Sequence, residues 1–303
     1  MSDEKEQARH LLDETYSALD EEARTFLEAR VGIEDEAQLK EHILEVQLSA
    51  WTVHKYGCIQ NFSFLQLRIS RLPGFEQLQK LGRERTDALF LDIGCCFGVD
   101  IRKAVASGFP VENVIASDLY GAFWDLGLKL FNDTPDTFPV PFLAGDAFSP
   151  DFLAPSPPFY SPPSTLRPSA STLREAGTLT PLLGHLSAIH ASSFFHLFNE
   201  AQQAALARKL AALLSPEPGS VIFGRHGGRS KKGLRREVPV GLWRTEPMWC
   251  HDVETWTALW DGEVFEKGTV KVEAVFMKGH SRQHGVGEDG GVPGALVWSI
   301  TRL

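Results

Sequence analysis

Strand-like segments alternate with helical segments in the middle of the chain, and this alternation is the feature that most restricts the fold. Apolar strands are expected at residues 88–94, 113–118 and 140–146, with helices at 99–107 and 121–132 between them. Strands that alternate with helices in this way predict a parallel sheet whose crossover connections are right-handed. This part of the chain is therefore expected to form an α/β core.

The C-terminal part of the chain extends the pattern and then changes it. Residues 182–198 are predicted to contain a fourth strand, which ends at His190. A helix is then predicted at 199–214, a strand at 220–225 and a short helix at 252–262, followed by strands at 269–277 and 295–303. The connection between the last two strands is Gly-rich and too short for a crossover helix, so these strands are expected to pair antiparallel. We expect a Rossmann-like fold with a mostly parallel seven-stranded sheet and an antiparallel C-terminal strand.

The composition divides the chain into regions. Residues 1–82 are predicted to form an N-terminal helical cap, with two or three amphipathic helices followed by an aromatic segment at 56–75. Residues 83–303 form the predicted core. Pro, Ser and Thr crowd residues 149–181, which lack apolar periodicity, so this segment is expected to be a mobile surface insertion without packed elements. The cap helices could also mediate a homodimer.

Charge and cysteine content exclude several classes of protein. The net charge of −9 argues against a nucleic-acid partner, because binding to a phosphate backbone needs clustered Lys and Arg. The first ten residues are too charged for a secretory signal and no apolar run could cross a bilayer, so we expect a cytoplasmic location. The four cysteines show neither a CxxC pair nor metal-ligand spacing, which predicts reduced thiols and no metal site.

The sharpest motif is LDIGCCFG, residues 91–98, in which a strand ends near Asp92 and breaks into a turn before a helix. Gly94 and Gly98 allow positive φ and a close approach of the backbone to a ligand. Cys96 occupies the place of the middle glycine in the G-x-G-x-x-G motif that binds a pyrophosphate. The turn therefore favours a ligand that has a nucleoside but no phosphate.

Acidic residues also end the next two strands. Asp118, followed by Leu119, is expected to accept hydrogen bonds from both ribose hydroxyls of such a nucleoside. Asp146 is expected to accept from an adenine amino group, with the amide of Ala147 or Phe148 donating to the ring. Each Asp alone could be a helix cap or a loop residue, but acidic residues at three successive strand ends favour one ligand-binding crevice.

Several segments together resemble a known family. LDIGCCFGVDIRK, SDLYGAFWDLGLKLF, SSFFHLF, PGSVIFGR and HDVETWTALW are similar to segments of the fungal methyltransferases of meroterpenoid and related secondary-metabolite pathways. The resemblance runs from about Tyr56 to the C-terminus. It implies the class I methyltransferase fold, S-adenosylmethionine as cofactor, and O-methylation of a lipophilic small-molecule acid or phenol to an ester or ether. Cys250 stands where the family tends to have an arginine.

Three histidines are candidates for catalysis. A carboxylate acceptor is already ionised at neutral pH, whereas a phenol benefits from a nearby base. His190, His196 and His251 are the candidates, although each could serve only in packing. His190 and its neighbour Ala191 are also expected to line the cofactor site. The ring of Tyr56 could cover the sulfonium, or could belong to ordinary core packing.

Other classes of function fit the sequence less well. A nicotinamide-dependent enzyme would share an acidic residue after the second strand but should have the full glycine motif. A protein methyltransferase would need a flat acceptor surface, whereas a helical cap favours closure over a small molecule. A non-catalytic protein with a degenerate cofactor pocket is a further alternative, and the intact Asp118 and Asp146 argue against it.

Overall fold

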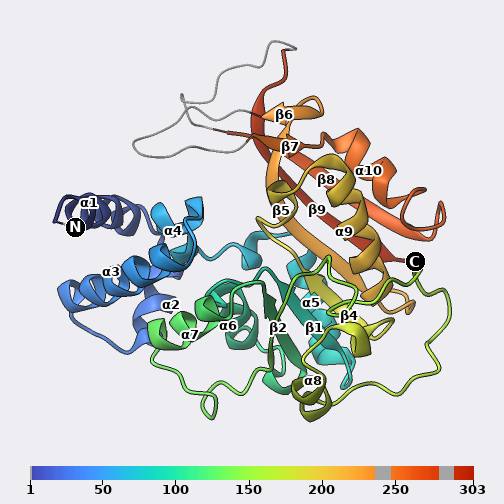
Figure 1. Ribbon diagram of the computed structural model, residues 1–303, viewed down its shortest axis with the longest axis horizontal. Helices are drawn as coiled ribbons and strands as arrows, with labels where there is room; N and C mark the ends of the chain where they lie inside the picture. Colours follow the sequence, from blue (N-terminus) through green and yellow to red (C-terminus); the bar gives the residue numbers. More distant parts are fainter. Residues whose placement is uncertain (1, 236–246, 280–289) are drawn as a thin grey trace.

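The computed structural model describes residues 2–235, 247–279 and 290–303, and a seven-stranded sheet lies at its centre (Figure 1). The strand order is β3-β2-β1-β4-β5-β9-β8. These strands are β1 Leu89–Ile93, β2 Val114–Asp118, β3 Phe142–Ala144, β4 Leu186–His190, β5 Val221–Arg229, β8 Val270–Lys278 and β9 Pro293–Arg302. Neighbours are parallel from β3 to β5, and β9 is antiparallel to both β5 and β8. The predicted Rossmann-like class I sheet is confirmed.

Helices cover both faces of the sheet, which is why β1 and β4 are buried along their whole length. One face packs against α5 Gly74–Glu84, α6 Val99–Ala106 and α7 Gly121–Leu130, and the other against α8 Ala170–Ala176, α9 Glu200–Leu213 and α10 Val253–Trp260. Capping boxes at Asn199 and Asp252 begin α9 and α10. The four helices predicted between and after the strands are confirmed to within two residues at each end.

The N-terminal residues form α1 Ser2–Ser17, α2 Glu21–Val31, α3 Glu36–Val53 and α4 Gly57–Gln60. Figure 1 shows these helices gathered beside α7, on the opposite side of the molecule from β8. Their apolar faces share one cluster with Phe97, Phe123 and Leu130 of the core. The predicted amphipathic helices are confirmed, whereas the division at residue 82 stays a prediction. None of the described helices is both long enough and apolar enough to cross a membrane.

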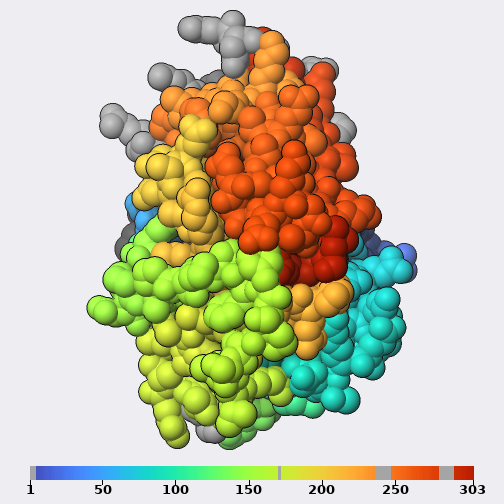
Figure 2. Space-filling model, turned by 90° about the vertical axis from the view of Figure 1, so that its right-hand side faces the viewer, coloured from blue at the N-terminus to red at the C-terminus, as the bar shows by residue number. Residues whose placement is uncertain are grey.

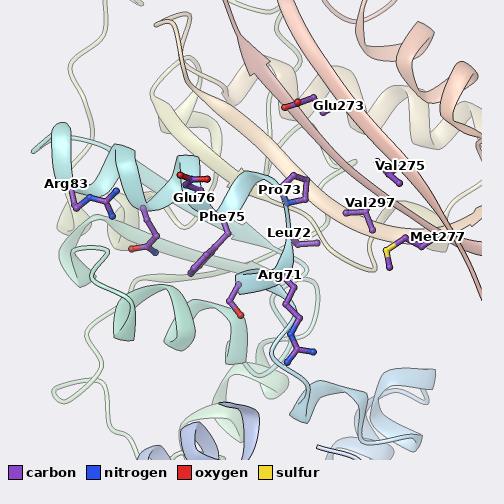
Figure 3. Close-up of a pocket in the computed structure, with 12 residues that line it drawn as sticks. Arg71, Leu72, Pro73, Phe75, Glu76, Arg83, Glu273, Val275, Met277 and Val297 are labelled. Atoms are coloured by element: carbon purple, nitrogen blue, oxygen red, sulfur yellow. The ribbon is translucent and has the colours of Figure 1, made fainter. Parts of the chain in front are cut away.

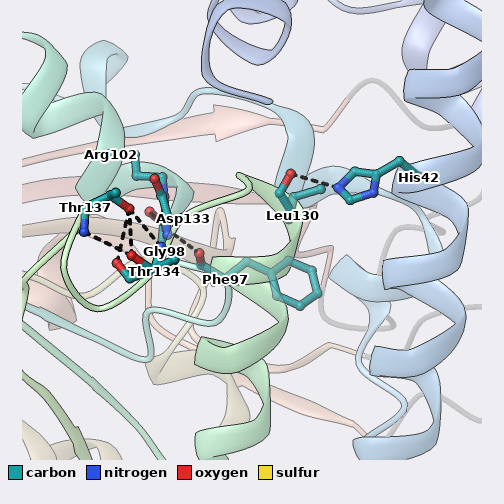
Figure 4. Close-up of polar contacts among 8 residues, drawn as sticks. All are labelled: His42, Phe97, Gly98, Arg102, Leu130, Asp133, Thr134 and Thr137. Atoms are coloured by element: carbon teal, nitrogen blue, oxygen red, sulfur yellow. Dashed lines mark hydrogen bonds and ion pairs between the residues drawn. The ribbon is translucent and has the colours of Figure 1, made fainter. Parts of the chain in front are cut away.

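Arg102 on α6 joins the segments around the glycine turn (Figure 4). Its Nη1 donates to the carbonyls of Phe97 and Gly98, at 2.9 and 3.1 Å, and its Nε donates to Asp133 at 2.8 Å. On the other side of α7, His42 of α3 hydrogen-bonds to the carbonyl of Leu130 at 3.1 Å. The turn, the end of α7 and the N-terminal helices are therefore held together by polar contacts as well as by the apolar cluster.

The Pro-rich segment at 149–181 differs from its prediction. It contains α8, which Ser169 caps at its N-terminus, and the buried side chains of Leu173 and Leu179. Earlier in the segment, the carbonyl of Phe159 accepts a hydrogen bond from Arg302 at 2.7 Å. Figure 2 shows this segment, in green, lying against the red C-terminal strand. The expectation that the insertion lacks packed elements is wrong, because a few apolar side chains anchor it despite its composition.

A second, two-stranded sheet of β6 Gly233–Arg235 and β7 Met248–Cys250 was not predicted. Short 3₁₀ turns link other elements: η1 Ser63–Leu65, η2 Ile69–Arg71, η3 Val111–Asn113, η4 Thr180–Leu182 and η5 Phe195–Leu197. A cavity of about 740 Å³ lies between the start of α5 and the strands β8 and β9, and its lining includes Phe75, Leu72, Val297 and Met277 (Figure 3). Asp118 and Asp146 do not line this cavity.

Candidate active site

The glycine turn after β1 has the backbone that its sequence predicts. The φ values of Gly94 and Gly98 are 73° and 65°, and that of Cys96 is 50°. A Cβ at Gly94 would lie 2.9 Å from the Phe194 ring, and one at Gly98 would lie 2.7 Å from Trp124. Both conformation and space therefore require glycine at these two positions. Any other residue at these positions would displace Phe194 or Trp124 and distort the turn.

Asp118 holds this turn from the end of the neighbouring strand, β2. Its Oδ2 accepts a hydrogen bond from the Cys96 amide at 2.9 Å, and its Oδ1 accepts from the Tyr120 amide at 3.1 Å. Burial raises the pKa of Asp118, and these backbone hydrogen bonds partly oppose the shift. Each carboxylate oxygen can accept more than one hydrogen bond. Asp118 can therefore fix the turn and still accept from a ligand.

Asp146 follows β3, the next strand in the sheet. The amide of Gly145 donates to the carbonyl of Asp118 at 3.0 Å, so the two acidic residues end neighbouring strands at one edge. The exposed Asp146 carboxylate accepts from the Phe148 amide at 2.8 Å, whereas the Ala147 amide has no partner among the described residues. The exposed side chain of Leu119 lies on the same edge, directly after Asp118.

Asp92 and His190 form a buried pair between β1 and β4. His190 Nδ1 lies 2.8 Å from Asp92 Oδ1, and His190 Nε2 lies 2.7 Å from the hydroxyl of Ser192. Burial raises the pKa of Asp92. Burial also lowers the pKa of His190, but the charge and hydrogen bond of Asp92 outweigh this, and the net shift is upward. Both ring nitrogens of His190 are engaged, and Ala191 is fully buried beside it.

The N-terminal helices lie directly over the glycine turn. The ring of Tyr56 is 6.0 Å from that of Phe123, and burial together with the charge of Asp118 raises the pKa of Tyr56. The thiol of Cys58, at the start of α4, hydrogen-bonds to Cys96, which lowers the pKa of Cys58 and raises that of Cys96. Tyr56 thus lies near the end of β2 and packs against the apolar cluster, and its role as a cover for the sulfonium stays a prediction.

The other two candidate histidines belong to a second cluster near β5. His196 Nδ1 accepts from the Gly227 amide at 3.0 Å. Burial and the charges of Arg235 and Arg68 lower the pKa of His196 to about 4. His251 Nδ1 lies 3.0 Å from the hydroxyl of Thr255, and burial lowers the pKa of His251 as well.

His226 also belongs to this cluster, although it was not among the candidates predicted from the sequence. The buried ring accepts a hydrogen bond from the Trp298 indole at 2.9 Å and lies 4.7 Å from the Trp256 ring. Burial and the neighbouring histidines lower the pKa of His226 well below its usual value. The sequence pattern could have indicated its burial. Side chains alternate between the two faces of a strand, so His226 lies on the same face as the buried Ile222.

Comparisons with known proteins identify the relatives of this chain. Residues 6–65 match the family described as "Meroterpenoid methyltransferase N-terminal domain". The chain is 31% identical to the O-methyltransferase phiE of a fungal species, over 76% of this chain and 66% of that protein. It is 30% identical to the O-methyltransferase atr3 of Stereocaulon alpinum, over 80% of this chain and 62% of that protein.

A third relative is matched over more of its length. The chain is 30% identical to the asnovolin E/chermesin D methyltransferase nvfJ of Aspergillus novofumigatus, over 80% of this chain and 76% of that protein. The match spans just under two thirds of the two O-methyltransferases above and about three quarters of this one. None of these matches supports a protein acceptor or a non-catalytic role. The chain belongs to the fungal S-adenosylmethionine-dependent methyltransferases of meroterpenoid and related secondary-metabolite pathways.

Proposed function

We propose that this chain transfers the methyl group of S-adenosylmethionine to an oxygen atom of a lipophilic small-molecule acid or phenol. The observation that carries the proposal is the strand edge where Asp118 and Asp146 lie next to a glycine turn with positive φ. Membership of the family supports the reaction, and the relative from Aspergillus novofumigatus is named for small-molecule substrates.

The residues at this edge fit the nucleoside part of the cofactor. Gly94 and Gly98 give the turn beside Asp118 a positive φ that other side chains rarely adopt. Asp118 has lone pairs left for the ribose hydroxyls, and the exposed Asp146 can accept from the adenine amino group. The Ala147 amide, which has no partner in the described part of the chain, is the donor for the adenine ring, because the Phe148 amide is already bonded to Asp146. Leu119 offers an apolar surface to the adenine.

The methyl donor supplies a methyl carbon bound to a positively charged sulfur. The acceptor oxygen attacks this carbon in line with the carbon–sulfur bond, and the sulfur leaves as a neutral thioether. The protein must therefore align the acceptor and exclude water. Asp92, His190 and Ser192 fix the loop after β4, so we assign His190 a positioning role and place Ala191 beside the cofactor. Tyr56 keeps its proton because its pKa is raised, and its neutral ring closes the crevice from the cap.

The three histidines near β5 differ in which ring nitrogen carries the proton. Backbone and indole N–H groups donate to Nδ1 of His196 and His226, so in the neutral rings Nε2 carries the hydrogen. In His251 it is Nδ1 that carries the hydrogen. The Thr255 hydroxyl donates to Asp252 Oδ1 at 2.7 Å, so His251 Nδ1 donates to that hydroxyl, and the buried Nε2 is an acceptor without a partner among the described residues. We assign His251 as the base for a phenol acceptor.

Calorimetric titration tests the cofactor site. The purified protein is titrated with S-adenosylmethionine, S-adenosylhomocysteine and NAD, and the titrations are repeated with Asp118→Ala and Asp146→Ala. Asp136→Ala, at an exposed position, is the control. We expect the first two ligands to bind, and we expect each of the two site variants to weaken binding roughly tenfold or more through lost charge-assisted hydrogen bonds.

Methylation of lipophilic acids and phenols is then measured with labelled S-adenosylmethionine. Methyl ester or ether formation supports the proposal. Binding of NAD in place of the two sulfur-containing ligands, or binding that neither Asp variant alters, would contradict it.

A further inference from the structure

Arg225 is a half-buried cation whose side chain has no partner among the described residues. It lies on β5, where its amide donates to the Ser192 hydroxyl at 3.2 Å and its carbonyl accepts from the Ser193 amide at 2.6 Å. These bonds fix its backbone beside the loop that follows His190. The guanidinium itself makes neither an ion pair nor a hydrogen bond within the part of the chain that the structure describes. A cation in such a place is costly unless an anion joins it.

Arg68 is held in a similar way next to the glycine turn. The amides of Arg68 and Ile69 donate to Asp100 Oδ1 at 3.3 and 3.0 Å. Asp100 lies in the first turn of α6, the helix that begins directly after Gly98. One Nη of Arg68 donates to Gln66 at 3.0 Å, but its buried Nε has no partner among the described residues. The backbone is thus anchored, and part of the guanidinium is left without a hydrogen-bond acceptor.

The two arginines lie close enough for their charges to act on each other. The charge of Arg68 adds to burial in lowering the pKa of Arg225, and it also acts on His196. Asp100 is the one carboxylate that opposes this shift at Arg225, and its Oδ1 is already occupied by two amides. His196 is neutral at pH 7. The surroundings therefore hold two cations and too little negative charge to balance them.

We propose that Arg68 and Arg225 together bind one carboxylate at the end of the crevice between the glycine turn and the loop after β4. Guanidinium groups suit a carboxylate because they offer paired donors in a plane. This inference rests on the proposed function, which provides two sources for that carboxylate. One is the α-carboxylate of the methionine part of the cofactor. The other is the carboxylate of an acid acceptor.

Binding measurements on Arg68→Met and Arg225→Met separate these sources. The first arm compares S-adenosylmethionine with decarboxylated S-adenosylmethionine, which lacks only the carboxylate. The second arm uses the most active acid from the methylation assay and its methyl ester, both titrated in the presence of S-adenosylhomocysteine. Arg208→Met, on the exposed side of α9, is the matched control, and thermal melting checks that each variant is folded.

In either arm we expect the carboxylate ligand to lose roughly tenfold to a hundredfold in affinity in both variants, while the ligand without the carboxylate is unaffected. A loss in the first arm assigns the site to the cofactor, and a loss in the second assigns it to the acceptor. Equal effects on each ligand and its counterpart, or no effect in both arms, would overturn the proposal. If wild-type protein fails to bind S-adenosylmethionine, the proposed function fails instead. If it binds but methylates no acid, the first arm alone decides.

Discussion

One ring nitrogen of His251 hydrogen-bonds to Thr255, and the other has no partner among the described residues. Burial lowers the pKa of this histidine, so the ring is neutral at pH 7. An unprotonated, unpartnered Nε2 is what a phenol would need in order to lose its proton during transfer. A carboxylate acceptor has no such need, because it is ionised already. The two classes of acceptor should therefore respond differently to a change at this residue.

We expect His251→Gln to lower the methylation rate of a phenol by roughly 10²- to 10⁴-fold and to leave that of an acid nearly unchanged, since general bases contribute about this much. Single-turnover rates with a matched phenol and acid provide the measurement. Thr255→Val, which removes the acceptor for Nδ1–H, should give a smaller loss that is also specific to the phenol. Equal losses for phenol and acid would show that His251 serves only in packing.

At the level of elements, the insertion shows how a few side chains can hold a Pro-rich segment in place. Leu173, on α8, is 1% exposed and belongs to the same apolar cluster as the sheet. Leu166, only a few residues earlier, is 92% exposed. One segment therefore contains one buried and one exposed leucine. The difference in unfolding free energy between variants at these two positions measures how much the packed part of the insertion contributes to the stability of the fold.

Leu173→Ala should lower the free energy of unfolding by roughly 2–4 kcal/mol, because it removes a fully buried side chain and leaves a cavity. Leu166→Ala should change it by less than about 0.5 kcal/mol, as is usual for exposed positions. Urea unfolding followed by circular dichroism measures both. If the two variants are equally stable, α8 unfolds independently of the core.

The whole molecule has several buried histidines whose shifted pKa values link its stability to pH. Burial lowers the pKa of His196, His226 and His251, that of His196 to about 4. Below about pH 6.5 the unfolded chain binds protons at these positions and the folded chain does not, so stability falls as pH decreases toward 4. The pKa values of His190, Asp92 and Asp118 are raised, so these three groups add stability to the folded state as pH decreases.

A variant of His196 isolates the contribution of this one histidine to the pH dependence of stability. Between pH 7 and pH 5, His196→Asn should lose about 1–2 kcal/mol less of its free energy of unfolding than the wild type loses, because a shift of one pH unit corresponds to about 1.4 kcal/mol per group. Urea unfolding at both pH values measures the difference. His10→Asn, at an exposed position, should behave like the wild type. An unchanged pH dependence in His196→Asn would contradict the prediction.

The sequence predicted the features that depend on local pattern. Strand and helix periods gave the elements of the core, and the glycines at 94 and 98 gave the turn, because their backbone conformation needs glycine. Contacts between distant residues could not be predicted in this way. Asp92 and His190 are 98 positions apart, and the lack of a partner for the Arg225 guanidinium among the described residues is recognisable only once its surroundings are known. The packing of α8 likewise depends on the tertiary fold, which overrode its composition.

The N-terminal helices share their apolar cluster with residues as far along the chain as Phe131. During synthesis, α1–α4 leave the ribosome before that partner exists. Their apolar faces then remain uncovered for roughly 3–13 s at typical elongation rates of about 5–20 residues per second. The yield of folded protein in a cell should therefore depend on chaperones that bind short apolar helices during this interval, and slower translation of residues 66–131 should lower it.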